Sequence, residues 1–439
     1  DDANLATLTF NDKATFTNGA VTVVDSIKMD GTIGKTITVG SGSDPVGGTT
    51  LSAKHIDLNG GMLLVAPAWG LTSSNVAVAS MGSTPPATAD VIVNGNVGVG
   101  RNSYLALGTA DTGWLPGVVG NYTKGVGLCK DGITAALGVF KGITIADTKG
   151  LVVDGSLMDM ATGTGGPLTT AVTSAAANKT AKFGANSLLV VNGANIYGDK
   201  AAITFAHTGG GTLSVAEGAK LLVTDAVAGQ DYTIVDKVTT VYVGTSPAIT
   251  TGGTTVWKTE GLSTTTDMIS LGDAVFDSTG KKVTTSAVRN DAHTVFPNLS
   301  DGMANAVNDL YTGHAGAAGQ PNWDYADVNS DQMGVRFLSR ATDNRFLGMD
   351  KEAAAESIES AARIAFAGAV PQMTRMASDA GTNAVVNRLG FANPADGAQA
   401  MDAEGKIVDR NTTGFALWIA PLWQSQHGWG MDADSMDYG

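Results

Sequence analysis

Few residues in this 439-residue chain have the types and spacing that chemistry requires. The turn Gly40-Ser-Gly-Ser-Asp44 could present a serine nucleophile, but no histidine precedes it and no aspartate stands directly before the serine. A simple turn is the better interpretation. The histidines are scattered, and none pairs with another at the spacing of metal ligands; they are His55, His207, His293, His314 and His427. We therefore predict no catalytic residue, no metal and no cofactor.

Two acidic segments contain carboxylate oxygens that could bind a cation, but neither has the complete ligand pattern of a known cation site. Residues 327–334 begin like a calcium loop, but glycine is missing at the sixth position, and Leu338 stands where the last carboxylate belongs. The segment is interpreted as a capped helix start. Asp432, Asp434 and Asp437 are interpreted as a solvated hairpin, with incidental cation binding as the alternative. Cys129 is the single cysteine, so no internal disulfide can form, and a small buried residue is expected there.

The composition indicates a protein built mainly from β-strands. The chain contains 57 glycines, only 15% of its residues are charged and 6% are aromatic, while valine, isoleucine, threonine and serine are abundant. Many turns and short strands follow from this balance. The net charge of −14 would repel phosphate backbones, so nucleic acid is not expected as a partner.

A two-strand unit with a polar corner recurs in the first 290 residues. Its copies are 56–65, 97–107, 143–153, 181–190 and 213–223. Each corner has nearly the same length, which favours coils that stack and complete one another's core. We predict a right-handed parallel β-helix, or solenoid, with coils of about twenty residues; a β-sandwich with irregular hairpins is the alternative. The predicted core leucines are Leu63, Leu105, Leu151, Leu188 and Leu221.

Helical spacing replaces this pattern beyond residue 290. Apolar side chains three and four positions apart predict short helices within 291–349, which form a connector. Residues 350–390 then predict a long helix with a stripe of small residues, capped by Asp350 and ended by Gly390. The segment 391–413, rich in Asp, Ala and Gly, is expected to be a mobile linker.

Residues 414–439 resemble one membrane-type β-strand with no second strand after it. Trp418, Trp423 and Trp429 bracket an apolar block close to the roughly 9–11 residues that a tilted strand needs to cross a bilayer. No run of 18 apolar residues exists that would predict a membrane-spanning helix. The start at Asp1-Asp2-Ala3 is consistent with removal of a signal peptide.

The order of these parts resembles a type V secretion autotransporter. The resemblance rests on the Gly/Thr/Val-rich solenoid with its closing unit 211–235, on the helix ending Asn383-Ala-Val-Val-Asn-Arg-Leu-Gly390, and on the strand entry Gly414-Phe-Ala-Leu-Trp-Ile419. In that family the solenoid is the passenger, the helix threads an outer-membrane barrel, and the tryptophan-bearing strand is the first of that barrel. Some members cleave the passenger at an asparagine near the helix end. The resemblance places that bond at Asn383 and Ala384, although Asn383 also fits an ordinary polar helix residue.

The expected function is that of a non-catalytic passenger with a structural or adhesive role. It would lie at the cell surface, in the outer membrane or outside the cell, with a ligand on a host or neighbouring cell. Two alternatives stay open. A self-assembling subunit of a surface layer or filament, a homo-oligomer, would use its end coils and C-terminal strand. A passenger enzyme would need a pocket that the sequence does not reveal.

Overall fold

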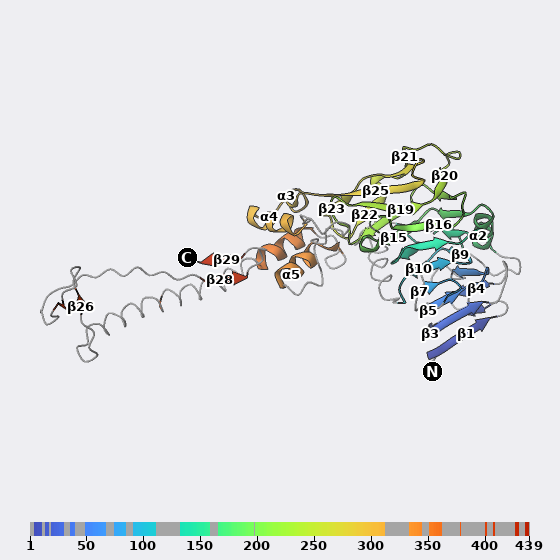
Figure 1. The fold of residues 1–439 in the computed structure, drawn as a ribbon, viewed down its shortest axis with the longest axis horizontal. Coiled ribbons are helices and arrows are strands. Elements are labelled where there is room, and N and C mark those ends of the chain that lie inside the picture. Colours follow the sequence, from blue (N-terminus) through green and yellow to red (C-terminus); the bar gives the residue numbers. More distant parts are fainter. Residues whose placement is uncertain are drawn as a thin grey trace.

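The computed structural model describes most of the chain up to Tyr311 and shorter segments beyond it (Figure 1). The described residues are 4–10, 14–16, 19–29, 36–39, 49–66, 74–84, 91–110, 132–158, 166–196, 198–311, 333–344, 351–361, 378, 400–401, 407–408, 426–429 and 435–438.

Three large sheets make up the β part, and we name them A, B and C. Sheet A runs in the order β1 (Asn4–Phe10), β3 (Gly19–Met29), β5 (Thr49–Asp57), β7 (Ser74–Met81), β10 (Ser103–Leu107), β11 (Ala135–Val139), β15 (Ser187–Asn192), β18 (Lys220–Thr224) and β22 (Leu262–Thr264). Sheet B consists of β2 (Ala14–Phe16), β4 (Thr36–Val39), β6 (Met62–Val65), β9 (Asn96–Val99), β13 (Leu151–Val153), β14 (Thr180–Phe183), β17 (Gly211–Val215) and β20 (Val238–Val243). All neighbouring strands in A and B are parallel.

Sheet C is parallel in its first half and antiparallel in its second. The parallel strands are β8 (Val91–Val93), β12 (Ile143–Ile145), β16 (Ala201–Phe205) and β19 (Asp231–Asp236). The antiparallel strands are β25 (Lys282–Arg289), β24 (Ala274–Asp277), β21 (Thr254–Trp257) and β23 (Ile269–Leu271). The 3₁₀ turns η1 (Gly193–Asn195) and η2 (Thr259–Gly261) follow β15 and β21.

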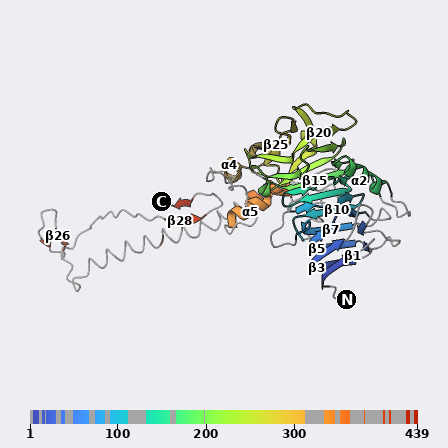
Figure 2. The same cartoon turned by 45° about the vertical axis from the view of Figure 1, so that its right-hand side comes forward.

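In its middle part the chain visits the sheets in turn, from A to C to B and back to A, whereas the described strands before β7 alternate between A and B. Strands β15, β16 and β17 form one such circuit, and β18, β19 and β20 form the next, each pairing in parallel with its counterpart in the first. Figure 2 shows the strands stacked from β1 and β3 near the N-terminus to β20 and β25 at the other end. Leu189 pairs with Leu221, which is 32 residues further along the chain. The expected coil of about twenty residues is therefore too short, because a circuit contains three strands and three corners.

Each corner singled out in the sequence contains a residue in the left-handed backbone region. These residues are Asn59, Asn102, Thr148, Asn186 and Gly218, with φ between 43° and 86°. Asparagine and glycine tolerate that conformation better than other residues, which explains the polar corners. The sequence shows where the chain turns, but the corners join different pairs of sheets: Asn102 lies between B and A, and Thr148 between C and B.

The interior between the sheets is a continuous apolar core. Four of the predicted core leucines, Leu63, Leu105, Leu151 and Leu221, are fully buried within it. Leu188 is also fully buried, but it belongs to a separate cluster with Ala106, Ala136 and Leu222. In strand β15 the neighbour Leu189 occupies the interior row, since successive residues of a strand point to opposite faces. The assignment of Leu188 to the solenoid interior was thus one position off.

Helix α2 (Pro167–Ala177) covers the outer face of sheet B, and the sequence had indicated only a loop before it. Leu168 and Val172 pack there against Leu64 and Val152. Gly98 lies beneath the helix, and a Cβ atom at that position would come within 2.6 Å of Val172 Cγ2. A glycine in the strand therefore lets the helix approach.

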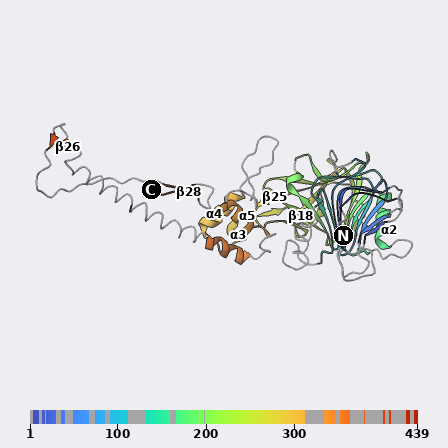
Figure 3. The same ribbon diagram turned by 90° about the horizontal axis from the view of Figure 1, so that it is seen from below.

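Helices follow β25, the last strand of sheet C in chain order, and gather beside it (Figure 3). They are α3 (Ala292–Val295), α4 (Asp301–Leu310), α5 (Met333–Ala341) and a helical segment 351–361. Their buried residues, among them Val307, Leu338 and Ile358, belong to the same apolar cluster as the sheet interior. We use the name cap for the described residues between 254 and 361, which comprise the antiparallel strands, the edge strand β22 and these helices. The sequence had predicted α4 and α5, and both are confirmed.

The prediction of a mainly β protein is confirmed, and the parallel sheets are compatible with a solenoid. They do not match a β-sandwich built from hairpins, whose strands are antiparallel. Near the C-terminus, β28 (Gln426–Trp429) pairs antiparallel with β29 (Ser435–Tyr438). A second strand therefore follows β28, whereas the apolar block 415–423 of the predicted membrane strand lies outside the described residues. Strands β26 (Ala400–Met401) and β27 (Ile407–Val408) also pair with each other, inside the segment predicted as a linker.

Candidate binding cleft

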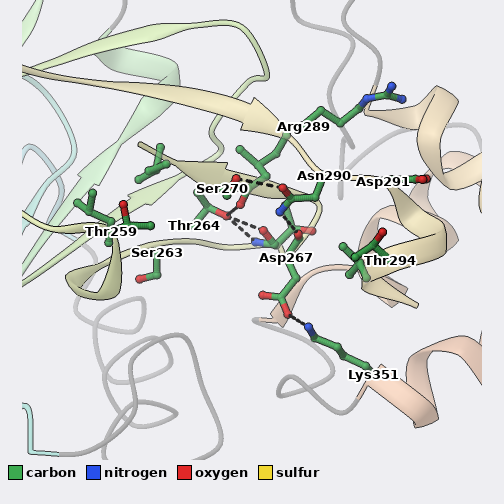
Figure 4. Close-up of a pocket in the computed structure, with 15 residues that line it drawn as sticks. Thr259, Ser263, Thr264, Asp267, Ser270, Arg289, Asn290, Asp291, Thr294 and Lys351 are labelled. Atoms are coloured by element: carbon green, nitrogen blue, oxygen red, sulfur yellow. Dashed lines mark hydrogen bonds and ion pairs between the residues drawn. The ribbon is translucent and has the colours of Figure 1, made fainter. Parts of the chain in front are cut away.

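A cleft of about 700 Å³ lies between the end of the sheets and the helices of the cap (Figure 4). Strands β22 and β23 form one wall, the end of β25 and helix α3 form the second, and the start of the helical segment 351–361 closes one side. The residues that line it are Thr259, Leu262, Ser263, Thr264, Thr266, Asp267, Ile269, Ser270, Leu271, Arg289, Asn290, Asp291, Thr294, Val295 and Lys351. Hydroxyl, amide and carboxylate groups thus alternate with aliphatic side chains.

Asp267 joins the β part of the cleft to its helical part. Its Oδ2 atom lies 2.8 Å from Lys351 Nζ, and its Oδ1 accepts a hydrogen bond of 3.1 Å from Asn344 Nδ2. Figure 4 shows the side chains of Asp267 and Lys351 pointing toward each other. Because two cap segments hold this carboxylate, its position in the cleft is fixed.

Asn290 fixes the opposite wall through both ends of its amide group. Its Nδ2 donates to the Asp267 carbonyl oxygen at 2.8 Å, and its Oδ1 accepts from Ser270 Oγ at 3.0 Å. The backbone amide of Asn290 donates to the Met268 carbonyl at 2.7 Å. The turn between β22 and β23 is therefore tied to the end of β25, and the cleft wall between them is rigid.

Asp291 caps helix α3 and carries the second carboxylate of the cleft. Its Oδ1 accepts hydrogen bonds from Asn308 Nδ2 at 2.9 Å, from the His293 amide and from His293 Nδ1. The hydrogen bond from the Asn308 side chain, followed by those from His293, lowers the pKa of Asp291 to about 2. This carboxylate is therefore charged at every physiological pH.

The cleft can form hydrogen bonds, but its residues do not form a catalytic set. Thr264 Oγ1 lies 2.6 Å from the Thr266 carbonyl oxygen, and Ser270 Oγ donates to the Asn290 side-chain amide. Thr259 Oγ1 donates to the Asp273 carboxylate at 2.7 Å, but Asp273 is not among the residues that line the cleft. His293, which stands between the cleft residues Asp291 and Thr294 in the chain, is held by Asp291. A nucleophile needs a base within hydrogen-bond reach.

Two other histidines in the described part of the chain have structural partners. His55 is buried, and its Nδ1 lies 2.9 Å from Ser80 Oγ. His207 Nδ1 lies 2.8 Å from Asp147 Oδ1, and its Nε2 is 2.7 Å from Lys179 Nζ. Both pairs join neighbouring strands or corners of the stack rather than a cavity.

Several sequence predictions fall outside the described residues. These are the turn 40–44, Cys129, most of the segment 327–334, His314, Asn383, Ala384, Trp418, Trp423, Asp432 and Asp434. Trp429 ends strand β28, and His427 and Asp437 are paired across β28 and β29. Within the described ranges, no three His, Cys, Asp or Glu side chains group together in a way that could hold a metal ion.

Sequence reasoning did not find the cleft. Its key residues, Asp267, Asn290 and Lys351, are far apart in the chain and meet only through the antiparallel pairing of β23 with β25 and the packing of the helices. One local signal was present, since Asp291 before Ala-His-Thr has the form of a helix N-cap. That signal predicts a helix start but not a cavity beside it.

Comparisons with known proteins do not identify this chain. No protein-family model, curated protein or solved structure matches it. Among the helices that the structure describes, none combines the length and apolar character needed to span a bilayer.

Proposed function

We propose that this chain is the passenger region of an autotransporter-like cell-surface protein with a structural or adhesive role. In this proposal the three sheets form a right-handed parallel β-helix, the helical region is the connector, and the C-terminal part belongs to the outer-membrane anchor. One observation supports it above all: interior leucines stack in register from strand to strand, as Leu105, Leu137, Leu189 and Leu221 do in sheet A. Such rows are typical of solenoids, which present long contact surfaces.

A non-catalytic role agrees with the chemistry of the described residues. The polar groups of the cleft are engaged with one another, as Asp267 is with Lys351 and Asn290 is with Ser270. A passenger enzyme would need a nucleophile and a base that face a common cavity. An extended surface with a polar cleft at one end suits attachment to another surface better than catalytic turnover of a substrate.

Expression behind a signal peptide in a Gram-negative host tests this proposal. We expect the chain to reach the outer-membrane fraction or the medium, and proteases added to intact cells to reach it. The purified chain should bind to cells or to an extracellular matrix more strongly than its heat-denatured form does. Retention in the cytoplasm or periplasm, together with no binding to any surface, would contradict the proposal.

A self-assembling subunit is the second candidate, and the end of the stack at β1 and β2 favours it. Within the described residues, each of these strands has a single neighbour in its sheet. An edge strand can accept a further strand from another chain. Light scattering after size exclusion at micromolar concentration separates the candidates: a ladder of oligomers supports assembly, whereas one monomer peak counts against it.

A further inference from the structure

We propose that the cleft at the cap binds a neutral sugar unit of a cell-surface glycan, an inference that rests on the adhesive role proposed above. The cleft residues supply hydrogen-bonding groups, aliphatic surface and balanced charge in one place. Its volume of about 700 Å³ lies within the range of small-molecule sites. Each of these three properties restricts the class of ligand.

The charges of the cleft cancel, which disfavours an ionic ligand. The cationic side chains are Lys351 and Arg289, and the carboxylates are Asp267 and Asp291. Lys351 pairs with Asp267 at 2.8 Å, so neither charge is left for a ligand of opposite sign. The Asp291 carboxylate, which is hydrogen-bonded to Asn308 and His293, repels an anionic ligand. The Lys351 and Arg289 side chains repel a cationic one.

The fixed polar groups suit hydroxyl groups, which both donate and accept. The carboxylate oxygens of Asp267 have further acceptor capacity beyond their contacts with Lys351 and Asn344. The Lys351 ammonium has three donors, and its side chain is 47% exposed despite the ion pair. Thr294 adds a hydroxyl from the exposed face of α3, on the other side of the cleft (Figure 4).

Aliphatic side chains between these groups suit the C–H face of a sugar ring. Leu262, Ile269, Leu271 and Val295 line the cleft, and Leu262 is partly exposed. Hydrogen bonds to charged groups are stronger than those between neutral groups. A ligand that places its hydroxyls on Asp267 and Lys351 and its C–H face on Leu262 uses both kinds of contact.

Saturation-transfer NMR on the purified full chain tests the proposal with defined sugars. The probes are lactose, maltose, cellobiose and N,N′-diacetylchitobiose as neutral disaccharides, with sialyllactose as an anionic comparison. We expect at least one neutral disaccharide to bind, and sialyllactose to bind no better than lactose. Asp267→Asn, which keeps the shape and removes the charge, should weaken binding about tenfold.

Two further variants make the result specific to the cleft. Thr294→Val removes one hydroxyl without changing the shape and should weaken binding severalfold. Asp199→Asn makes the same chemical change as Asp267→Asn on an exposed turn that does not line the cleft, and it should leave affinity unchanged. Thermal unfolding of each variant shows whether it folds. If Asp267→Asn does not fold, Thr294→Val still tests the proposal.

Three outcomes would overturn the sugar site: no neutral disaccharide binds, binding is the same in Thr294→Val and Asp267→Asn as in the unchanged chain, or sialyllactose binds more tightly than the neutral sugars. A chain that reaches the surface and attaches to cells, yet ignores every sugar probe, would refute this inference while leaving the proposed function intact. Failure to reach the surface would refute the proposed function instead.

Discussion

The parallel strands of the stack and the cap at its end are stabilised in different ways. In the stack, each interior position is repeated by the strand on either side, as Leu189 is by Leu137 and Leu221. The cap helices share the same apolar core, but in the cap distant parts of the chain also meet in single polar contacts, such as Tyr311 Oη with Thr342 Oγ1 and the Ser300 amide with Glu359. Because the interior contacts of the stack are repeated from strand to strand, its stability depends little on any one loop. The cap depends more on particular pairs of residues. A binding cleft, which needs particular side chains in particular places, is therefore more expected in the cap than in the repeated strands of the stack.

The largest effect is expected in an interior row. Leu189→Ala should lower the free energy of unfolding by about 3 kcal/mol, because the side chain is fully buried between two leucines and a cavity remains. Leu262→Ala, in the cap strand β22 at the partly exposed edge of the same sheet, should cost about half as much. Denaturant unfolding followed by circular dichroism measures both. Equal losses of unfolding free energy in the two variants would mean that the stack and the cap do not differ in how much they depend on a buried leucine.

A smaller effect is expected where helix α2 meets sheet B. Gly98→Val should cost about 2 kcal/mol, because the added side chain would overlap Val172 and force the helix outward. Hydrogen exchange should then show loss of protection in α2 before any loss in β17. Gly302→Ala in α4 is the control: no atom lies within 4 Å of the added carbon, and we expect a gain of up to about 1 kcal/mol. A helix that stays protected in Gly98→Val would refute the close approach.

The cap should respond to loss of one hydroxyl. Tyr311→Phe removes the buried contact with Thr342 Oγ1 at 2.8 Å and should cost about 1.5 kcal/mol. Tyr242→Phe, at an exposed position of sheet B, should change stability by less than about 0.5 kcal/mol. The thermal midpoints of the two variants provide the comparison. If Tyr311→Phe leaves the thermal midpoint unchanged, single polar contacts do not hold the cap.

A corner of the stack should become more stable when its strained residue is replaced. Thr148 has φ of 64°, a conformation that costs a β-branched residue about 1 kcal/mol. Thr148→Gly should recover part of that cost, a gain of about 0.5 kcal/mol after the entropy of the unfolded glycine is included. The same change at Thr144, inside strand β12, should destabilise. Destabilisation at both positions, measured by chemical unfolding, would argue against strain at the corner.

The smallest effect concerns pH and the buried His55. Burial lowers the pKa of His55, and nearby Asp57 opposes this only in part. The unfolded chain then binds the proton more readily, so stability is fully present above pH 6.5 and falls as pH drops toward the lowered pKa. Unfolding curves between pH 7 and pH 5 should show this loss, and His55→Asn should remove it. A slope that persists in His55→Asn would assign the effect to other groups.

Much of the stack was predictable because its signals are local. Left-handed residues such as Asn102 and Asn186 mark corners, and short apolar strands follow them. The failures have physical causes. Strand β15 reads Ser-Leu-Leu-Val-Val-Asn and is buried on both faces, so its alternation cannot show which leucine points inward. Helix α2 is rich in Ala and Thr and has only a weak apolar stripe, so the sequence pattern did not reveal it.

The sequence by itself determined that this protein consists mainly of short strands joined by polar corners, and that helices follow residue 290. These features depend on backbone preferences and on the alternation of neighbouring side chains, which act over a few residues. Only the tertiary structure decided which corner joins which sheets, that Leu189 rather than Leu188 faces the interior, and that Asp267, Asn290 and Lys351 share a cleft. Those outcomes depend on contacts between residues that are distant in the chain, and local sequence patterns do not indicate which distant residues will be in contact.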